Sequence, residues 1–167
     1  MKKIALMLAL ALMLTVLTGC GSEPQEAVPA ETTGAAPVVL DLQAIYDSMT
    51  ALEGTPEMIP LDADMQFNFC GINPDDCKTS LAAICADGMQ ADEIWLVEAV
   101  DAAALARLQE AAQFRLNAKD EESVTYSPEQ NAIVKKAQVI TVGNYLALVV
   151  SPDVDTLAGL FRTAAGI

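Results

Sequence analysis

The sequence predicts one folded domain of the α/β or α+β class, with helices packed against a mixed sheet of about four strands. Two observations support this prediction. Segments with apolar residues at helical spacing alternate along the chain with short apolar runs of strand length. Near the C-terminus, two strand-like runs flank Gly143-Asn144, which is a strong signal for a β-hairpin. The predicted domain spans residues 41–167, and two segments of different character precede it.

Residues 1–19 have the layout of a signal peptide. Two lysines precede an apolar run of thirteen residues, which is too short to span a membrane. Leu17-Thr18-Gly19-Cys20 then resembles the lipobox of bacterial lipoproteins, in which the cysteine is acylated and becomes the first residue after cleavage. We therefore expect a stable acyl anchor on Cys20, at the outer face of the bacterial cytoplasmic membrane. A plain secretory signal and an uncleaved membrane helix are the alternatives.

Residues 20–40 are predicted to be a disordered tether. They hold few large apolar side chains and many Pro, Gly, Ala and Glu residues, so they cannot bury enough surface to fold. Removal of the signal peptide leaves seven basic and 23 acidic residues, a net charge of −16 (7 − 23). Such a surface repels nucleic-acid phosphates and anionic lipid headgroups. We expect no nucleic-acid partner, and membrane attachment only through the lipid on Cys20.

The first two elements of the domain are predicted to be a helix and a strand. Apolar residues at helical spacing indicate a helix over residues 41–53, which Asp41 can cap. In residues 65–69 three large apolar side chains alternate with two amides. This alternation is typical of a half-buried strand, with the apolar side chains on one face and the amides on the other.

The middle of the domain is predicted to contain two helices and a strand. Asn73 and Pro74 are residue types that begin a helix, which we expect to continue to about Ala86. The unbroken apolar run 94–97 predicts a strand covered on both faces. Helical spacing returns over residues 101–118.

The domain is predicted to end with the hairpin and a last helix. Residues 139–142 and 145–150 form the two expected hairpin strands. Asp153 can cap the helix that follows. The residues expected to face inward from this helix are Val154, Leu157, Leu160, Phe161 and Ala164.

Four short signatures, each occurring once, follow one another along the domain in a characteristic order. They are Ala91-Asp92-Glu93-Ile94, Arg115, Tyr126-Ser127-Pro128-Glu129 and Gly143-Asn144-Tyr145. Together they resemble a family of bacterial lipoproteins known as domain of unknown function 4358, over roughly residues 41–165. Asn73 departs from the family pattern, which usually has an acidic residue there, but Asn caps a helix as well as Asp does. The resemblance implies a fold and a location, and it implies no activity.

Arg115 and Tyr126 are the first candidates for contacting a ligand or partner. If both line one cleft, an anionic or polar ligand can meet a guanidinium and a phenol there. The structural alternative for Arg115 is an ion pair with Glu110, Glu122 or a strand carboxylate. The alternative for the segment from Tyr126 to Glu129 is a loop that ends in a helix start.

Cys70, Cys77 and Cys85 form an odd set in a chain predicted to be exported. Burial, one disulfide with a free thiol, and metal binding are the three possibilities. On the predicted helix, Cys77 and Cys85 share a face about 12 Å apart, so only Cys70 could bond either one. Burial is the simplest account, because structural zinc sites use Cys or His ligands in fours and the sequence has no His. We expect no metal and no cofactor.

The lack of His also excludes Ser-His-Asp and Cys-His nucleophilic sites and every imidazole base. Carboxylate pairs remain available for glycoside hydrolysis, but they stand where loops and helix caps ordinarily place acids. The pairs are Asp62 with Asp64, Asp75 with Asp76, and Asp153 with Asp155. We expect no catalytic residue and favour a membrane-anchored, non-enzymatic module that binds an envelope protein or a small ligand. A carboxylate-dependent hydrolase and an accessory subunit of an envelope transport or sporulation complex are the alternatives.

Overall fold

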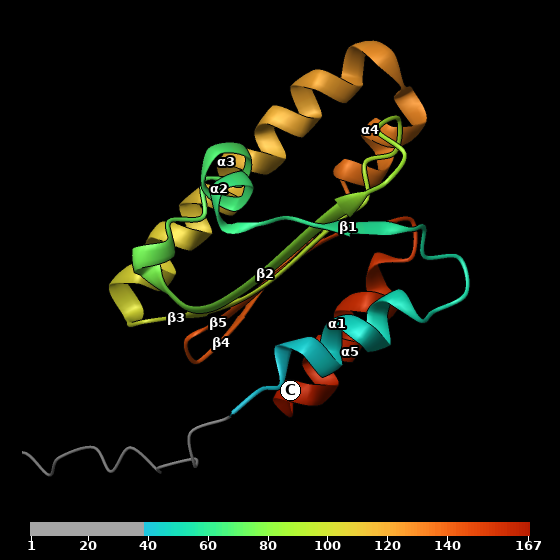
Figure 1. The fold of residues 1–167 in the computed structure, drawn as a ribbon. Helices are drawn as coiled ribbons and strands as arrows, with labels where there is room; N and C mark the ends of the chain where they lie inside the picture. The colour runs from blue at the N-terminus through green and yellow to red at the C-terminus, as the bar shows by residue number, and fades with distance from the viewer. Residues whose placement is uncertain (1–38) are drawn as a thin grey trace, which may run out of the picture. The chain divides into compact units, whose positions relative to one another are not determined.

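A computed structural model describes residues 39–167 (Figure 1). The predicted signal peptide, Cys20 and nearly all of the predicted tether lie outside the described residues. The elements, in chain order, are α1 (Leu42–Thr50), β1 (Met58–Pro60), α2 (Ala63–Met65), the π-helix η1 (Gln66–Cys70), the 3₁₀ turn η2 (Pro74–Asp76), β2 (Cys77–Cys85), β3 (Glu93–Ala99), α3 (Ala102–Tyr126), α4 (Pro128–Val134), β4 (Gln138–Val142), β5 (Tyr145–Val150) and α5 (Val154–Ala165).

One sheet of five strands forms the centre of the domain, in the order β1-β2-β3-β5-β4. Every neighbouring pair is antiparallel. The predicted fold class and single domain are confirmed in their α+β form; the sheet has five strands where about four were predicted, and it is antiparallel and not mixed. β3 and β5 lie in the middle and are buried along almost their whole length. This is the environment that their unbroken apolar runs predicted.

Helices cover both faces of the sheet, so the core has two parts (Figure 1). On one face α1 and α5 pack side by side against Ile94, Leu96 and Val149. On the other face α3 and α4 pack against Trp95 and Val97. Alternate residues of β3 therefore belong to opposite layers, as the pleat of a strand requires. No helix within residues 39–167 is both long and apolar enough to cross a membrane.

The first helix and the hairpin confirm their predictions. The carboxylate of Asp41 accepts a hydrogen bond from the backbone N–H of Ala44 at 3.0 Å, which caps α1. β4 and β5 pair through a two-residue turn at Gly143-Asn144. Gly143 has φ of +55°, a backbone conformation that a residue without Cβ adopts at no steric cost.

The last helix forms where it was predicted, with two differences in detail. Asp153 occupies the cap position but its side chain makes no capping hydrogen bond, because its backbone is not in the extended conformation usual for a cap. The buried residues of α5 are Val154, Leu157, Ala158, Phe161 and Ala165. Ala164 is exposed, and Leu160 is half-buried at the edge of the core.

The strand predicted at residues 65–69 is wrong, and the segment is helical. α2 runs directly into the π-helix η1, which ends at Gly71 with φ of +76°. Met65, Phe67 and Phe69 are about half exposed, at 45%, 51% and 50%. Gln66 and Cys70 are the buried residues of η1 instead. The helical turn places residues four apart on one face, so the apparent strand alternation has no structural counterpart.

The helix predicted over residues 74–86 is also wrong, although its start signal is correct. The side chain of Asn73 accepts a hydrogen bond from the N–H of Asp75 at 3.0 Å, and Pro74 begins a single 3₁₀ turn. β2 follows at once and pairs with β1 and β3. Pairing within the sheet overrides the helical spacing of the segment. Cys77 and Cys85 therefore lie at opposite ends of a strand and share no helix face.

The helix predicted over residues 101–118 is confirmed at its start and continues further than expected. The carboxylate of Asp101 accepts a hydrogen bond from the N–H of Ala104 at 2.8 Å. The helix then runs on to Tyr126, so α3 has 25 residues. Ser127 caps α4 through its side chain, and Pro128 is the first residue of that helix. The predicted helix start at Ser127-Pro128-Glu129 is confirmed, whereas Tyr126 belongs to α3 and not to a loop.

Candidate functional site

Glu93 is a carboxylate buried at the start of β3, with no exposed surface. Its side chain lies on the face of the sheet that α3 covers, two residues before Trp95. The guanidinium of Arg115 binds it through two nitrogens: Nε is 3.0 Å from Oε1 and Nη2 is 2.9 Å from Oε2. Nζ of Lys119, one helical turn further along α3, lies 2.8 Å from Oε2. One buried acid therefore holds two cations in place.

Three further side chains complete the surroundings of Glu93. The indole Nε1 of Trp95 donates a hydrogen bond to Oε1 at 2.7 Å, and the thiol of Cys70 lies 3.9 Å from the same oxygen. The ring of Phe69 stacks on Arg115, with the guanidinium carbon 4.0 Å from the ring centre. Phe69 and Cys70 are consecutive residues of η1. The π-helix thus places the Phe69 ring on the guanidinium of Arg115 and the Cys70 thiol next to the carboxylate of Glu93. π-helical turns often occur at functional sites.

The charges in this cluster fix the protonation state of Glu93. Burial alone would raise the pKa of its carboxyl, but the bonds and charges of Arg115 and Lys119 outweigh burial and hold the pKa below its ordinary value. Burial, with the adjacent Glu93, raises the pKa of the Cys70 thiol to about 12. At neutral pH the cluster therefore contains a carboxylate, two cations and a neutral thiol.

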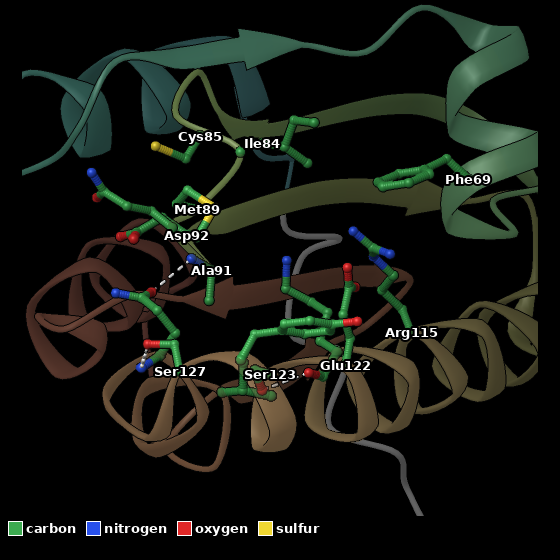
Figure 2. A pocket seen from close by; sticks show the side chains of 16 residues that line it. Phe69, Ile84, Cys85, Met89, Ala91, Asp92, Arg115, Glu122, Ser123 and Ser127 are labelled. Atoms are coloured by element: carbon green, nitrogen blue, oxygen red, sulfur yellow. Dashed lines mark hydrogen bonds between the residues drawn. The ribbon is translucent and has the colours of Figure 1, made fainter.

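A cleft of about 300 Å³ lies directly over this cluster (Figure 2). One side of the cleft, from floor to rim, is the face of α3 that carries Arg115, Lys119, Glu122 and Tyr126. Figure 2 shows Arg115 rising from α3 toward the ring of Phe69. The opposite wall belongs to β2 and the loop that follows it, and residues of α4 close one end. The other lining residues are Phe69, Ile84, Cys85, Gly88, Met89, Gln90, Ala91, Asp92, Ser123, Ser127, Gln130 and Val134.

Arg115 and Lys119 keep hydrogen-bond donors that the protein does not use. The bonds to Glu93 use Nε and Nη2 of Arg115, so Nη1 has no hydrogen-bond partner within residues 39–167. Lys119 donates one of its three N–H groups to Glu93. Their side chains are 12% and 11% exposed, so the cations are almost desolvated but still border the cleft. The floor of the cleft can therefore donate to an acceptor on a ligand.

The structure brings both predicted contact residues into this one cleft. Arg115 lies at its floor and Tyr126 at its rim, where Tyr126 is 78% exposed. Arg115 also makes the ion pair with a strand carboxylate that was its structural alternative, since Glu93 belongs to β3. Lys119 and Phe69 were missed. The signal for Lys119 was its position four residues after Arg115, which places both on one face of a helix only if the helix continues past residue 118.

The carboxylate pairs considered for hydrolysis have structural roles at several positions. Asp62 caps α2 by accepting from the N–H of Met65 at 2.8 Å. Asp76 is buried and forms an ion pair with Arg107, whose bonds lower the pKa of the Asp76 carboxyl. Asp155 accepts a hydrogen bond from Gln138 at 2.6 Å.

Asp92 is a buried acid that lines the cleft. Burial raises its pKa against an opposing hydrogen bond from Ser151. Asp92 directly precedes β3, and the charges of Lys119 and Asp153 also act on its carboxyl. Asp92 and Glu93 therefore have different hydrogen-bond partners: Ser151 for Asp92, and Arg115, Lys119 and Trp95 for Glu93.

The three cysteines of the domain are free thiols. Cys70 and Cys85 are buried, and Cys77 is half-buried at the start of β2. Burial raises the pKa of Cys77 to about 11, with a contribution from Asp76. Among the residues described, no group of three or more His, Cys, Asp or Glu side chains could hold a metal ion.

Comparison with protein families decides where this chain belongs. The model of the domain of unknown function DUF4358 matches residues 51–151, which is more than half of the chain. The chain is a member of the DUF4358 family. The DUF4358 match contains all five strands and every residue that lines the cleft, whereas α1 and α5 lie outside it. Comparison with curated proteins and with solved structures finds no match.

Proposed function

We propose that this DUF4358 protein is an extracytoplasmic lipoprotein, anchored through Cys20, whose domain is a non-enzymatic binding module. The cleft over Glu93 is its binding site. One observation carries the proposal. Seven basic residues remain after the predicted cleavage, and two of them, Arg115 and Lys119, lie almost buried at the floor of this cleft with N–H donors that Glu93 does not use.

The burial of these charges argues for a role in binding. Removing charged groups from water costs free energy, and a buried ion pair is often no more stabilising than apolar residues of the same volume. A cluster that only stabilised the fold would therefore need neither a second cation, Lys119, nor an Arg115 side chain that is partly exposed to the cleft. Desolvated cations beside a cleft are, however, well suited to hydrogen-bond an acceptor that enters it.

The rim of the cleft supports the same proposal. Phe69, Met89 and Tyr126 line it, and each is at least half exposed. Large apolar side chains gathered at the mouth of a cleft with a charged floor are typical of interaction sites. A ligand that bound here would cover them.

A carboxylate-dependent hydrolase is the less favoured function. It needs two acids in one cleft, at least one of them with a raised pKa and able to donate a proton. Glu93 has a lowered pKa and both its oxygens are bonded to cations. Asp92 has a raised pKa and lines the cleft, but its carboxyl is buried and accepts a hydrogen bond from Ser151. The geometry therefore favours binding.

Photo-crosslinking in intact cells tests whether the cleft binds anything. The crosslinking amino acid benzoylphenylalanine replaces Tyr126 in the full-length chain, and Phe114 in a matched control. Both positions lie on α3 with similar exposure, 78% and 76%, and only Tyr126 lines the cleft. We expect adducts, identified by mass spectrometry, from position 126 above the level at 114. Equal yields at both positions would contradict the proposed binding site.

A further inference from the structure

Acidic as well as basic residues line the cleft, and Glu122 is the exposed acid among them. Glu122 lines it, three residues after Lys119 on the same face of α3. Glu122 is exposed and forms no hydrogen bond or ion pair with the side chains of residues 39–167. One helix face thus presents unused N–H donors of Arg115 and Lys119 together with an unused carboxylate, about one turn apart.

The charged residues that line the cleft are balanced in number. Arg115 and Lys119 are basic, and Asp92 and Glu122 are acidic, while Glu93 lies behind the lining and is bonded to both cations. The domain as a whole is strongly acidic, with seven basic and twenty acidic residues in the described part of the chain. A free anion approaching the cleft is repelled by this field, and a free cation meets two cations at the floor. A ligand with both charges and no net charge avoids both penalties.

The remaining wall is apolar and the space is small. Ile84, Met89 and Val134 are apolar residues of the lining, and the ring of Phe69, which also lines the cleft, stacks on Arg115. A volume of about 300 Å³ is at the lower limit of ordinary small-molecule sites. The ligand therefore needs an apolar group and no great length.

We infer that the cleft binds a zwitterion with an apolar side group, of the size of a free α-amino acid or a dipeptide. Its carboxylate bonds to Nη1 of Arg115 and Nζ of Lys119, and its ammonium group pairs with Glu122. Its side group lies against Ile84 and Met89. This inference rests on the proposed function, because it names the ligand class of the same site.

Calorimetric titration of the full-length protein in detergent tests the ligand class. The probes are the apolar L-amino acids and their dipeptides. For each that binds, two analogues follow: the carboxamide, which lacks the carboxylate, and the desamino acid, which lacks the ammonium. We expect the zwitterion to bind about tenfold or more tightly than either analogue, because each analogue leaves a charged group of the cleft without its partner. Equal affinity for the desamino acid, or no binding of any zwitterion, would overturn the inference.

A pair of variants assigns the ammonium contact. Glu122→Gln removes the carboxylate that lines the cleft, and Glu121→Gln removes its exposed neighbour on α3, which does not line it. We expect Glu122→Gln to lower the affinity for the zwitterion about tenfold and to leave the desamino acid unaffected, whereas Glu121→Gln changes neither. Identical behaviour of the two variants would contradict the assignment. Crosslinking at position 126 without zwitterion binding would refute this inference and leave the proposed binding function standing.

Discussion

At the scale of single residues, Glu93 determines the geometry of the site. It has no contact with solvent, and it orients Arg115 and Lys119 through bonds of 2.8 to 3.1 Å. Trp95 adds a fifth hydrogen bond, through its indole Nε1. A carboxylate so fully engaged holds the two cations in one arrangement before any ligand arrives. Such preorganisation lowers the cost of ordering side chains when a ligand binds.

Substitution of Glu93 by Gln should destabilise the protein strongly. The amide keeps the shape but removes the charge, which leaves two nearly buried cations uncompensated. Breaking a buried ion pair in this way costs about 3–5 kcal/mol. Urea unfolding at pH 7 measures the loss. Glu98→Gln is the matched control on the same strand, because Glu98 pairs with a half-exposed Lys78 and should lose at most about 1 kcal/mol. Similar losses for the two variants would contradict the role given to Glu93.

The same residue makes stability depend on pH in a predictable direction. The folded protein holds the pKa of Glu93 below its ordinary value of 4.5. Its contribution is therefore complete above about pH 4.5 and is lost as the pH falls through the lower, folded-state pKa. We expect the difference in unfolding free energy between wild type and Glu93→Gln to be constant from pH 7 to 5.5 and to shrink below pH 4.5. Urea unfolding across this range measures it. A difference that is unchanged at pH 3 would show that the charge of Glu93 is not the cause.

At the scale of elements, the sequence predicted helix starts and turns correctly where their hydrogen bonds join residues close together in the chain. Asp41, Asn73 and Asp101 each cap the turn that they were predicted to begin, because a cap bonds to an N–H only two or three residues away. The hairpin at Gly143 depends equally on local geometry. Signals that depend on distant partners failed. β2 is a strand because it pairs with β1 and β3, and the pattern of its own nine residues does not indicate this pairing.

The candidate site was predictable in part for the same reason. Arg115 and Tyr126, predicted as possible contact residues, both line the cleft, whereas Lys119 and Glu122 were not predicted, because they join the same helix face only when α3 continues to residue 126. The second half of that helix is rich in charged residues and shows no apolar stripe, so its periodicity ends before the helix does. Residues 115, 119, 122 and 126 recur at intervals of four, three and four, which is the spacing of one helix face.

The two helix starts at Asp101 and Asp153 give a test of capping at this scale. Asp101 bonds the N–H of Ala104, whereas Asp153 makes no capping bond with its side chain. Asp101→Ala should therefore lower the unfolding free energy by about 1 kcal/mol, and Asp153→Ala by a few tenths, since it loses only an interaction with the helix dipole. Thermal or urea unfolding compares the two. A larger loss at Asp153 would show that the cap geometry is wrong.

At the scale of the whole molecule, the chain enters the domain on the side away from the candidate site. Residues 39 and 40 lead into α1, where the N–H of Leu40 donates to the hydroxyl of Tyr145 at 3.3 Å. α1 and α5 cover one face of the sheet, and the cleft belongs to the face covered by α3 and α4 (Figure 1).

The anchor itself is the last prediction. Cys20→Ala should release the protein from membranes or leave it unprocessed, because the lipobox cysteine is both the acylation site and the first residue after cleavage. Fractionation and gel mobility of the full-length chain, expressed in a bacterium that processes lipoproteins, measure both effects. Wild type should stay with the membrane through a high-salt wash, since two acyl chains hold it there and its acidic surface contributes no attraction that salt could screen. Cys77→Ala, which alters a half-buried thiol outside the lipobox, is the control and should fractionate as wild type does. Unchanged fractionation and mobility of Cys20→Ala would contradict the lipid anchor while leaving the cleft and its proposed ligand unaffected.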